Sequence, residues 1–207
     1  MPETPIDSHD VAQEMGHGES KNVSKRVLGV VNEKFGVPVS IPRVGQIGGP
    51  LMATEVWNED EWLPSLIKTS KSLNSLSSYV LDIDWIPVDK LATIILEIVH
   101  FAVTTDKARI YNIRKRLGPQ IQVVQLAEWI ETLERLDGTD PCELTTKPAI
   151  KILDFYRRLE GARSRSGSAI AGSEYSTAHV IAVSKTMAEL APVNMGWMDI
   201  WLNQWGY

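Results

Sequence analysis

A helical repeat followed directly by an apolar strand restricts the fold of this chain more than any other stretch. Between Glu19 and Glu33 valines recur at the spacing of one helix face, and Gly36 supplies a stop signal. Residues 37–47 then form a largely apolar run, which is typical of a strand buried in a parallel sheet with helices on both faces. Pro42 lies within that run and cannot donate a ladder hydrogen bond, which argues against a central strand. The sequence therefore predicts an α/β fold.

The composition is that of a globular chain with a core of its own. Of the 207 residues, 43% are hydrophobic and 23% are charged, which is ordinary for a folded domain. The formal net charge of −5 argues against nucleic acid as the main partner, because that role needs a clustered basic face. The single cysteine, Cys142, excludes an intramolecular disulfide and offers no metal-ligand cluster. We therefore expect no nucleic-acid partner and no metal site.

Two segments bear on the compartment in which the chain works. Residues 1–5 are polar and acidic, without the basic start and apolar run of a secretory signal. The longest apolar stretch, residues 91–103, carries Glu97 and His100 and is too short to cross a bilayer. We therefore expect a cytoplasmic protein with no membrane partner, in which residues 91–103 form a buried helix.

Several short motifs follow one another along the chain. Residues 15–21 read Met-Gly-His-Gly-Glu-Ser-Lys, and residues 41–49 read Ile-Pro-Arg-Val-Gly-Gln-Ile-Gly-Gly. Later motifs are Trp-Asn-Glu-Asp-Glu-Trp-Leu-Pro at 57–64, Asp-Trp-Ile-Pro-Val-Asp at 84–89 and Gln-Val-Val-Gln-Leu-Ala-Glu-Trp at 122–129. Together they resemble the C-terminal part of a thioester reductase domain. Such domains belong to the extended short-chain dehydrogenase/reductase family, with a male-sterility-type NAD-binding domain, and end fungal NRPS-like and carboxylic-acid-reductase-like enzymes. The resemblance covers nearly all of the chain.

The resemblance implies a catalytic pair at the start of the first helix. Family members read Gly-Tyr-Gly-Glu-Ser-Lys there, and the lysine lies one turn after the tyrosine, lowers its pKa and makes it a proton donor. In this chain the tyrosine position holds His17, and Lys21 remains. Histidine titrates near neutrality, but a neighbouring lysine favours its neutral form. His17 and Lys21 are the candidate catalytic residues; the alternative is that position 17 has drifted in a site no longer used for reduction.

The resemblance also implies the cofactor side of a cleft. In the family the strand over residues 37–47 ends beside the nicotinamide of NADPH, which assigns Pro42, Arg43, Val44, Gln46 and Ile47 to cofactor binding. The alternative for the glycines of this stretch is a tight loop after a strand.

Tryptophans are the candidates for substrate contact. By resemblance, Trp57 and Trp62 lie where the chain enters the substrate-binding part, and they are candidates for the wall that holds an acyl chain or a pantetheine arm. Buried aromatic residues more often form a core. Three further tryptophans recur at a spacing of four and form one aromatic stripe, either core or a docking face: Trp197, Trp201 and Trp205.

Motif borders and periodicity predict the remaining elements. Residues 79–88 and 108–113 read as strands, and Asp89 reads as the N-cap of a helix over residues 91–99. Residues 122–129 read as a short strand that leads into a helix, and residues 148–159 read as an amphipathic helix.

The family's glycine-rich nucleotide-binding turn does not occur in this sequence. By resemblance, the family's catalytic serine or threonine would lie on a strand that precedes Met1. We therefore expect an incomplete Rossmann-like (extended SDR) fold that lacks the N-terminal nucleotide-binding strands and has a mostly helical C-terminal substrate region. The expected organisation is a flexible segment over residues 1–14, a Rossmann-like remnant over 15–50 and a substrate-binding region over 51–207. NADPH is the cofactor by resemblance, but without those strands we expect little binding by this chain.

The leading functional hypothesis is a truncated thioester-reductase-like protein of secondary metabolism, which does not reduce thioesters on its own and assists by binding an acyl thioester or a phosphopantetheinyl carrier protein. An unpaired strand edge predicts self-association, or a partner that completes the sheet. One alternative is a redox-independent cyclase or condensation-type release enzyme that uses His17 and Lys21. Another is that the chain is a fragment of a larger multidomain synthetase.

Overall fold

The computed structural model describes residues 1–6, 16–52, 54–74, 84–102, 108–115, 134–135, 139–166 and 175–207. The chain divides into two compact units, and each unit is discontinuous in sequence. Unit 1 comprises Met1–Gly48, Asp84–Lys115 and Glu174–Pro192, and unit 2 comprises Gly49–Ile83, Arg116–Ser173 and Val193–Tyr207. The predicted regions 15–50 and 51–207 are each continuous, whereas the chain returns to unit 1 twice.

Helix α1 spans Gly16–Phe35, as the valine spacing predicts. It ends at Gly36, which adopts the left-handed backbone conformation with φ of 65° and donates its N–H to Asn32 O at 2.9 Å. The Asn32 side chain then ties the helix to the segments that precede two strands, because its Nδ2 donates to Val37 O at 2.8 Å and its Oδ1 accepts from Ala108 N at 3.0 Å. Asn32 thereby fixes the direction in which the chain leaves the helix.

The strands of unit 1 form two parallel pairs. Strand β1 (Ser40–Val44) pairs with β4 (Arg109–Ile113), and β2 (Ile47–Gly48) pairs with β3 (Ile86–Pro87). The predicted strand over residues 37–47 is therefore shorter and divided at Gly45 and Gln46. Gly45 N still donates to Ile113 O of β4, but Gln46 O accepts from Ile86 N, so the chain changes its partner strand within this turn.

Pro42 fits β1 because of its position in the ladder. Gly45 donates toward β4, and N–H groups alternate in direction along a strand, so the nitrogen of Pro42 points away from β4. No ladder bond with β4 is lost. Among the described residues no strand pairs with this outer edge of β1, as expected for a strand that contains a proline.

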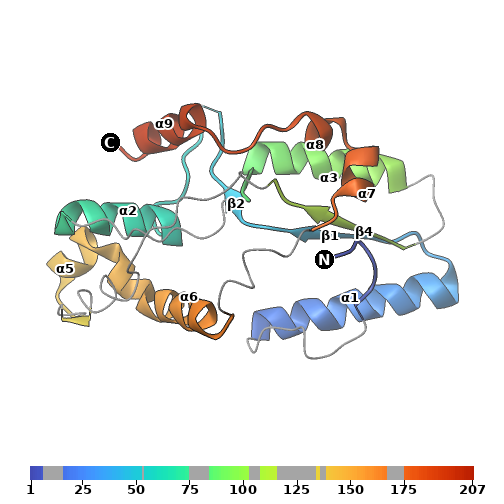
Figure 1. Ribbon diagram of the computed structural model, residues 1–207, viewed down its shortest axis with the longest axis horizontal. Coiled ribbons are helices and arrows are strands. Elements are labelled where there is room, and N and C mark those ends of the chain that lie inside the picture. The colour runs from blue at the N-terminus through green and yellow to red at the C-terminus, as the bar shows by residue number, and fades with distance from the viewer. Residues whose placement is uncertain are drawn as a thin grey trace. The chain divides into compact units, whose positions relative to one another are not determined.

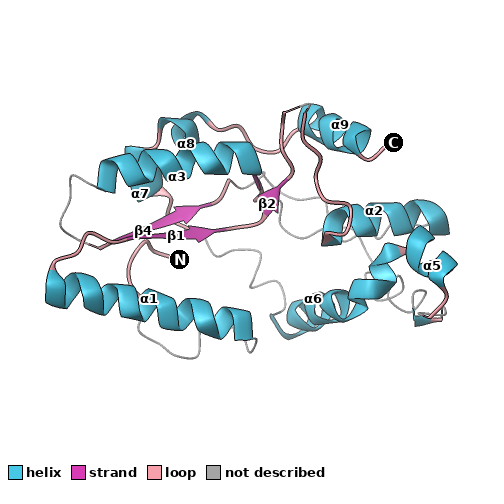
Figure 2. Cartoon of the chain, turned by 180° about the vertical axis from the view of Figure 1, so that it is seen from behind, coloured by secondary structure: helices cyan, strands magenta, loops and turns pink. Residues whose placement is uncertain are grey.

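Helices lie on both faces of the β1–β4 pair, as Figures 1 and 2 show. Helix α1 lies on one side, and α3 (Val88–Ala102), α7 (Ala178–Val183) and α8 (Lys185–Glu189) lie on the other. Helix α3 buries Leu91, Ile94 and Ile98. The prediction that Asp89 is its N-cap is wrong: the helix begins at Val88, and Asp89 lies inside the first turn, where its charge still favours the helix dipole.

The described residues of unit 2 form helices and their connections, with no strand among them. They are α2 (Trp62–Leu73), α5 (Pro141–Thr146), the 3-10 helix η1 (Pro148–Ile152), α6 (Leu153–Ser166) and α9 (Met195–Gln204). The helix predicted over residues 148–159 is divided between η1 and α6. The core joins α2 to this pair through Leu66, Ala149 and Tyr156, and the Tyr156 hydroxyl donates to Trp62 O at 2.6 Å. The α/β class and the mostly helical later part are thus confirmed.

Some predictions fall outside the described residues. These are the flexible segment beyond residue 6, the strand over residues 79–83 and the motif at 122–129. Within the described part of the chain, no helix is long and apolar enough to span a membrane.

Candidate functional site

Helix α1 carries both candidate catalytic positions. His17 and Lys21 lie in one unbroken helix, so their backbones are one turn apart as the spacing predicts. The Lys21 side chain is exposed. The His17 side chain lies outside the described part of the structure, so the chemistry of this pair remains a prediction.

The residues assigned to the cofactor lie in the later part of β1, in the turn that follows it and at the start of β2. Val44 and Ile47 are 36% and 40% exposed. Gln46 uses its side-chain Nε2 within the turn itself, donating to Ile47 O at 3.0 Å. Two main-chain hydrogen bonds hold the turn: Gly45 N donates to Ile113 O, and Gln46 O accepts from Ile86 N. These positions therefore lie at or near the carboxyl end of a parallel strand, which is where ligands bind in open α/β sheets.

An ion pair that sequence analysis did not find packs against this turn. Arg114 Nε lies 2.6 Å from Asp84 Oδ2, and its guanidinium also lies 4.0 Å over the ring of Tyr175. A Cβ added at Gly45 would lie 2.8 Å from Arg114 Nε and 3.2 Å from Asp84 Oδ2. Position 45 therefore has to be glycine for the ion pair to lie where it does. The signal in the sequence was Asp84, the first residue of the motif at 84–89.

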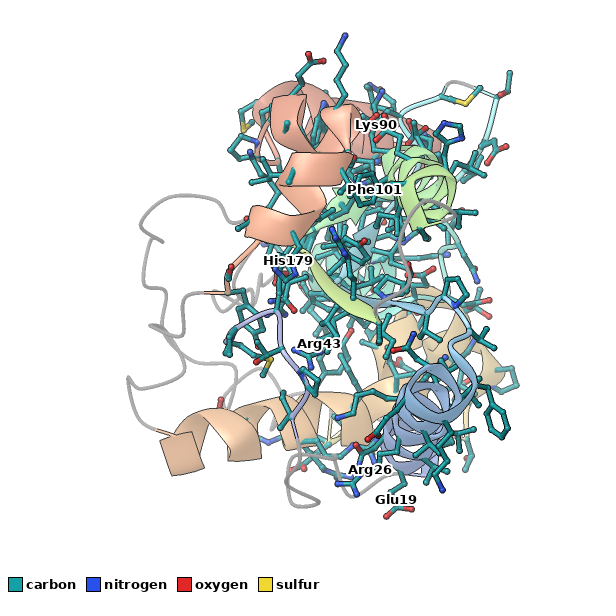
Figure 3. All side chains as sticks on the ribbon, turned by 90° about the vertical axis from the view of Figure 1, so that its right-hand side faces the viewer. Glu19, Arg26, Arg43, Lys90, Phe101 and His179 are labelled. Carbon is teal, nitrogen blue, oxygen red and sulfur yellow. The ribbon has the colours of Figure 1, made fainter. Side chains whose placement is uncertain are left out.

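Arg43 lies against the N-terminal segment of the chain. Its Nη1 donates to Pro2 O at 3.1 Å and its Nη2 donates to Thr4 O at 2.8 Å, and Figure 3 shows Arg43 beside this segment. Burial lowers the pKa of Arg43, and the nearby Glu3 and Tyr175 partly offset that effect by raising it. The guanidinium remains charged at neutral pH and is held by main-chain oxygens.

The two candidate substrate tryptophans belong to unit 2. Trp57 is 4% exposed, and its ring centroid lies 5.0 Å from that of Trp201 and 5.3 Å from that of Trp205. Its Nε1 donates to Glu61 Oε2 at 2.9 Å. A Cβ at Gly49 would come within 2.7 Å of Trp57, so the indole is enclosed by protein atoms. The aromatic stripe of α9 is thus part of the core around Trp57.

Trp62 is less enclosed. It is half-buried at the start of α2, and its ring centroid lies 6.0 Å from that of Phe155 on α6. No group of three or more histidine, cysteine, aspartate or glutamate side chains in the described ranges has the arrangement of a metal site. Cys142 is exposed and unpaired with another cysteine.

Comparison with known proteins relates the whole chain to one group of fungal enzymes. A carboxylic acid reductase of Neurospora crassa is 31% identical over 229 residues, which cover 100% of this chain and 21% of that protein. The adenylate-forming reductase Nps11 of Serpula lacrymans is 27% identical over 230 residues, covering 98% of this chain and 20% of that protein. The chain is a homologue of these fungal reductases. No family model matches it.

The fold of the reductase homologue is similar to that of a solved structure. The crystal structure of the terminal R domain from the myxalamid PKS-NRPS biosynthetic pathway superimposes with a TM-score of 0.71 and 15% identity, covering 99% of this chain and 53% of that one. The predicted resemblance to the C-terminal part of a thioester reductase domain is confirmed. The homologue spans about a fifth of the length of the curated relatives it matches.

The described residues of the homologue do not by themselves fit a nicotinamide dinucleotide. Arg43 binds the carbonyls of Pro2 and Thr4, and Arg114 fills the space above Gly45. The sequence contains no glycine-rich turn of the kind that receives a pyrophosphate at a helix N-terminus.

Proposed function

We propose that these 207 residues correspond to the substrate-side part of a thioester reductase domain and do not reduce a thioester with NADPH on their own. The observation that carries the proposal is the combination of reductase homology over the whole chain with a histidine at position 17 and no glycine-rich turn. The pyrophosphate site supplies many contacts in such domains. Its loss lowers affinity by several orders of magnitude, since each factor of ten corresponds to about 1.4 kcal/mol.

The role that remains is binding. A reductase domain of this family receives an acyl or peptidyl thioester from a phosphopantetheinyl carrier protein, and we infer that the chain retains an auxiliary site for that acyl or pantetheine group. Trp62 is the better candidate for its wall, because Trp57 is 4% exposed and Trp62 is only half-buried. Supporting evidence would be weaker binding of an acyl-pantetheine probe by Trp62→Ala than by Trp62→Phe, which keeps a flat ring.

A partner is also expected at the outer edge of β1. No strand of the described residues pairs with this edge, and unpaired edges recruit other strands. We propose that a strand from a second copy, or from another protein, completes the sheet there.

His17 and Lys21 lie one turn apart in the same helix, and this favours one alternative, a redox-independent release enzyme. A nucleophile within the acyl chain would attack the thioester carbon, His17 would take its proton, and the Lys21 ammonium would stabilise the oxyanion before the thiol leaves. Release of thiol from an acyl thioester without NADPH, lost in His17→Ala, would support it. A further alternative is that the chain works as a fragment of a larger multidomain synthetase. The coverage of only 21% of the carboxylic acid reductase supports this alternative.

Isothermal titration calorimetry with NADPH tests the leading proposal. We expect no binding tighter than about 1 mM by the folded wild-type chain, or by His17→Tyr, because tyrosine restores a proton donor and leaves the pyrophosphate site missing. Size-exclusion chromatography and circular dichroism establish that the sample is folded. Micromolar binding by the wild-type chain would contradict the proposal, since it would require a cofactor site rebuilt from these residues.

A further inference from the structure

The N-terminal residues occupy a site on unit 1 that is built around one carboxylate. Glu3 is 6% exposed, although glutamate is rarely so buried without partners. Its Oε1 accepts from Asn112 N at 2.9 Å, and its Oε2 accepts from His179 N at 2.7 Å and from Ser176 Oγ at 3.3 Å. Three donors from two distant parts of the chain thus converge on a single side chain.

The main chain of the same segment is held as well. Met1 O accepts from Ser176 N at 3.0 Å and from Asn112 Nδ2 at 3.2 Å. Arg43 holds the carbonyls of Pro2 and Thr4. Contacts to carbonyl oxygens do not depend on side-chain identity, whereas the three donors at Glu3 require an acceptor side chain. Main-chain contacts that give affinity and a side-chain pocket that gives selectivity are the two features by which proteins recognise peptide segments.

The site lies on the outer edge of β4. Arg109 N and Ile113 O of β4 form hydrogen bonds with the chain of β1. Because successive residues of a strand face opposite sides, Asn112 N points away from β1. A second outward group of this edge, Ile110 O, lies 3.0 Å from Nδ1 of His179. Figure 3 shows His179 and Arg43 beside the N-terminal segment. The charge is complementary, since the Arg43 guanidinium faces a segment whose one charged side chain is Glu3.

We propose that Arg43, Asn112, Ser176 and His179, here called the edge site, form a receptor for a short acidic peptide, and that Met1–Thr4 is its intramolecular occupant. A partner segment with a carboxylate at the position of Glu3 can take the same place. The tethered occupant has a high effective concentration, so a free peptide competes poorly until the tether's own carboxylate is removed.

The test uses the full chain and a fluorescent hexapeptide of residues 1–6, with binding followed by anisotropy. Glu3→Ala should bind the peptide at least about tenfold more tightly than the wild-type chain, because the weakened tether no longer competes. The same peptide with alanine at its third position should bind at least about tenfold more weakly, because it lacks the carboxylate. Glu33→Ala removes an exposed carboxylate from α1 and should behave as wild type. Equal peptide binding by wild type and Glu3→Ala, or none by a folded Glu3→Ala, would overturn the proposal.

Amide hydrogen exchange provides a second readout on the same samples. The Asn112 and His179 amides should exchange at least about tenfold faster in Glu3→Ala and should slow again when the peptide is added. Unchanged exchange would overturn the proposal. If Glu3→Ala does not fold, Glu3→Gln keeps the oxygen acceptor without the charge, and the same two measurements apply with the same decisive outcomes.

Discussion

On the outer edge of β4, Asn112 N donates to Glu3 and Ile110 O lies beside His179 Nδ1, whereas no described strand pairs with the outer edge of β1. The two strands are equal in length and pair in register. One edge is thus closed by the chain's own side chains, and the other carries Pro42 and exposed Val44. The chain's own side chains thus cover the outer edge of β4, and we propose that a second copy or another protein pairs with the outer edge of β1.

The largest expected effect comes from opening the closed edge. Asn112 is fully buried, and its Nδ2 donates to Ser176 O at 2.8 Å and to Met1 O at 3.2 Å. Asn112→Ala leaves both carbonyls without this donor and should lower the free energy of unfolding by about 3 kcal/mol. Urea denaturation followed by circular dichroism measures it. Asn203→Ala, an exposed position on α9, is the control, and an equal loss there would contradict the account.

A smaller loss is expected at the carboxyl end of β1. Gly45→Ala places a Cβ 2.8 Å from Arg114 Nε, and the ion pair with Asp84 has to shift. We expect a loss of about 2 kcal/mol in the same urea assay, the usual cost of overpacking. Gly29→Ala is the matched control, since nothing lies within 4 Å of its new Cβ. In mid-helix that change should stabilise by about 0.5–1 kcal/mol. Similar effects at both glycines would argue against a tightly packed turn.

Glu97 tests a region away from both edges. Burial raises the pKa of Glu97, but hydrogen bonds from Ser184 and Thr186, with the charge of Lys185, more than offset this and leave it lowered. A carboxyl with a lowered folded pKa stabilises above its unfolded pKa, and the stabilisation is lost as pH falls through the folded pKa. When the pH falls from 7 to about 3, the free energy of unfolding should therefore drop more for the wild-type chain than for Glu97→Gln. The difference should be no more than about 1 kcal/mol, because solvent screens this carboxylate. Parallel pH profiles would contradict the assignment; Glu189→Gln, an exposed carboxylate, should follow wild type.

The smallest change in stability is expected at the open edge. Pro42→Val adds an N–H that points away from β4, so the free energy of unfolding should change by no more than about 0.5 kcal/mol. Self-association should increase, because the edge gains a donor. Sedimentation velocity over a range of concentrations measures it, with Pro38→Val, outside β1, as the control. A destabilised Pro42→Val that stays monomeric would show that this edge is already closed.

Much of unit 1 follows from local patterns in the sequence. The valine repeat and Gly36 predict α1, and the apolar runs predict β1 and β4. The closure of the β4 edge does not follow from them, because Glu3 and His179 are 176 residues apart and only the folded chain brings them together. The hydrogen bonds from Arg43 to the carbonyls of Pro2 and Thr4 span about forty residues, so local sequence patterns do not predict them either.

The candidate site divides in the same way. The spacing of His17 and Lys21 predicts their common helix, because one turn is a local property. The enclosure of Trp57 depends on Trp201 and Trp205, which pack on it from far along the chain. Resemblance to a family located these residues, but their exposure required the structure.

Amide hydrogen exchange of the monomeric wild-type chain tests the difference between the edges most directly. The N–H groups of Ser40 and Val44 point outward from β1. On β4, the outward N–H group of Asn112 donates a hydrogen bond to Glu3. The account predicts that Asn112 exchanges at least about a hundredfold more slowly than Val44. Equal protection of Val44 and Asn112 in a monomer would contradict it, because the outer edge of β1 would then already be paired.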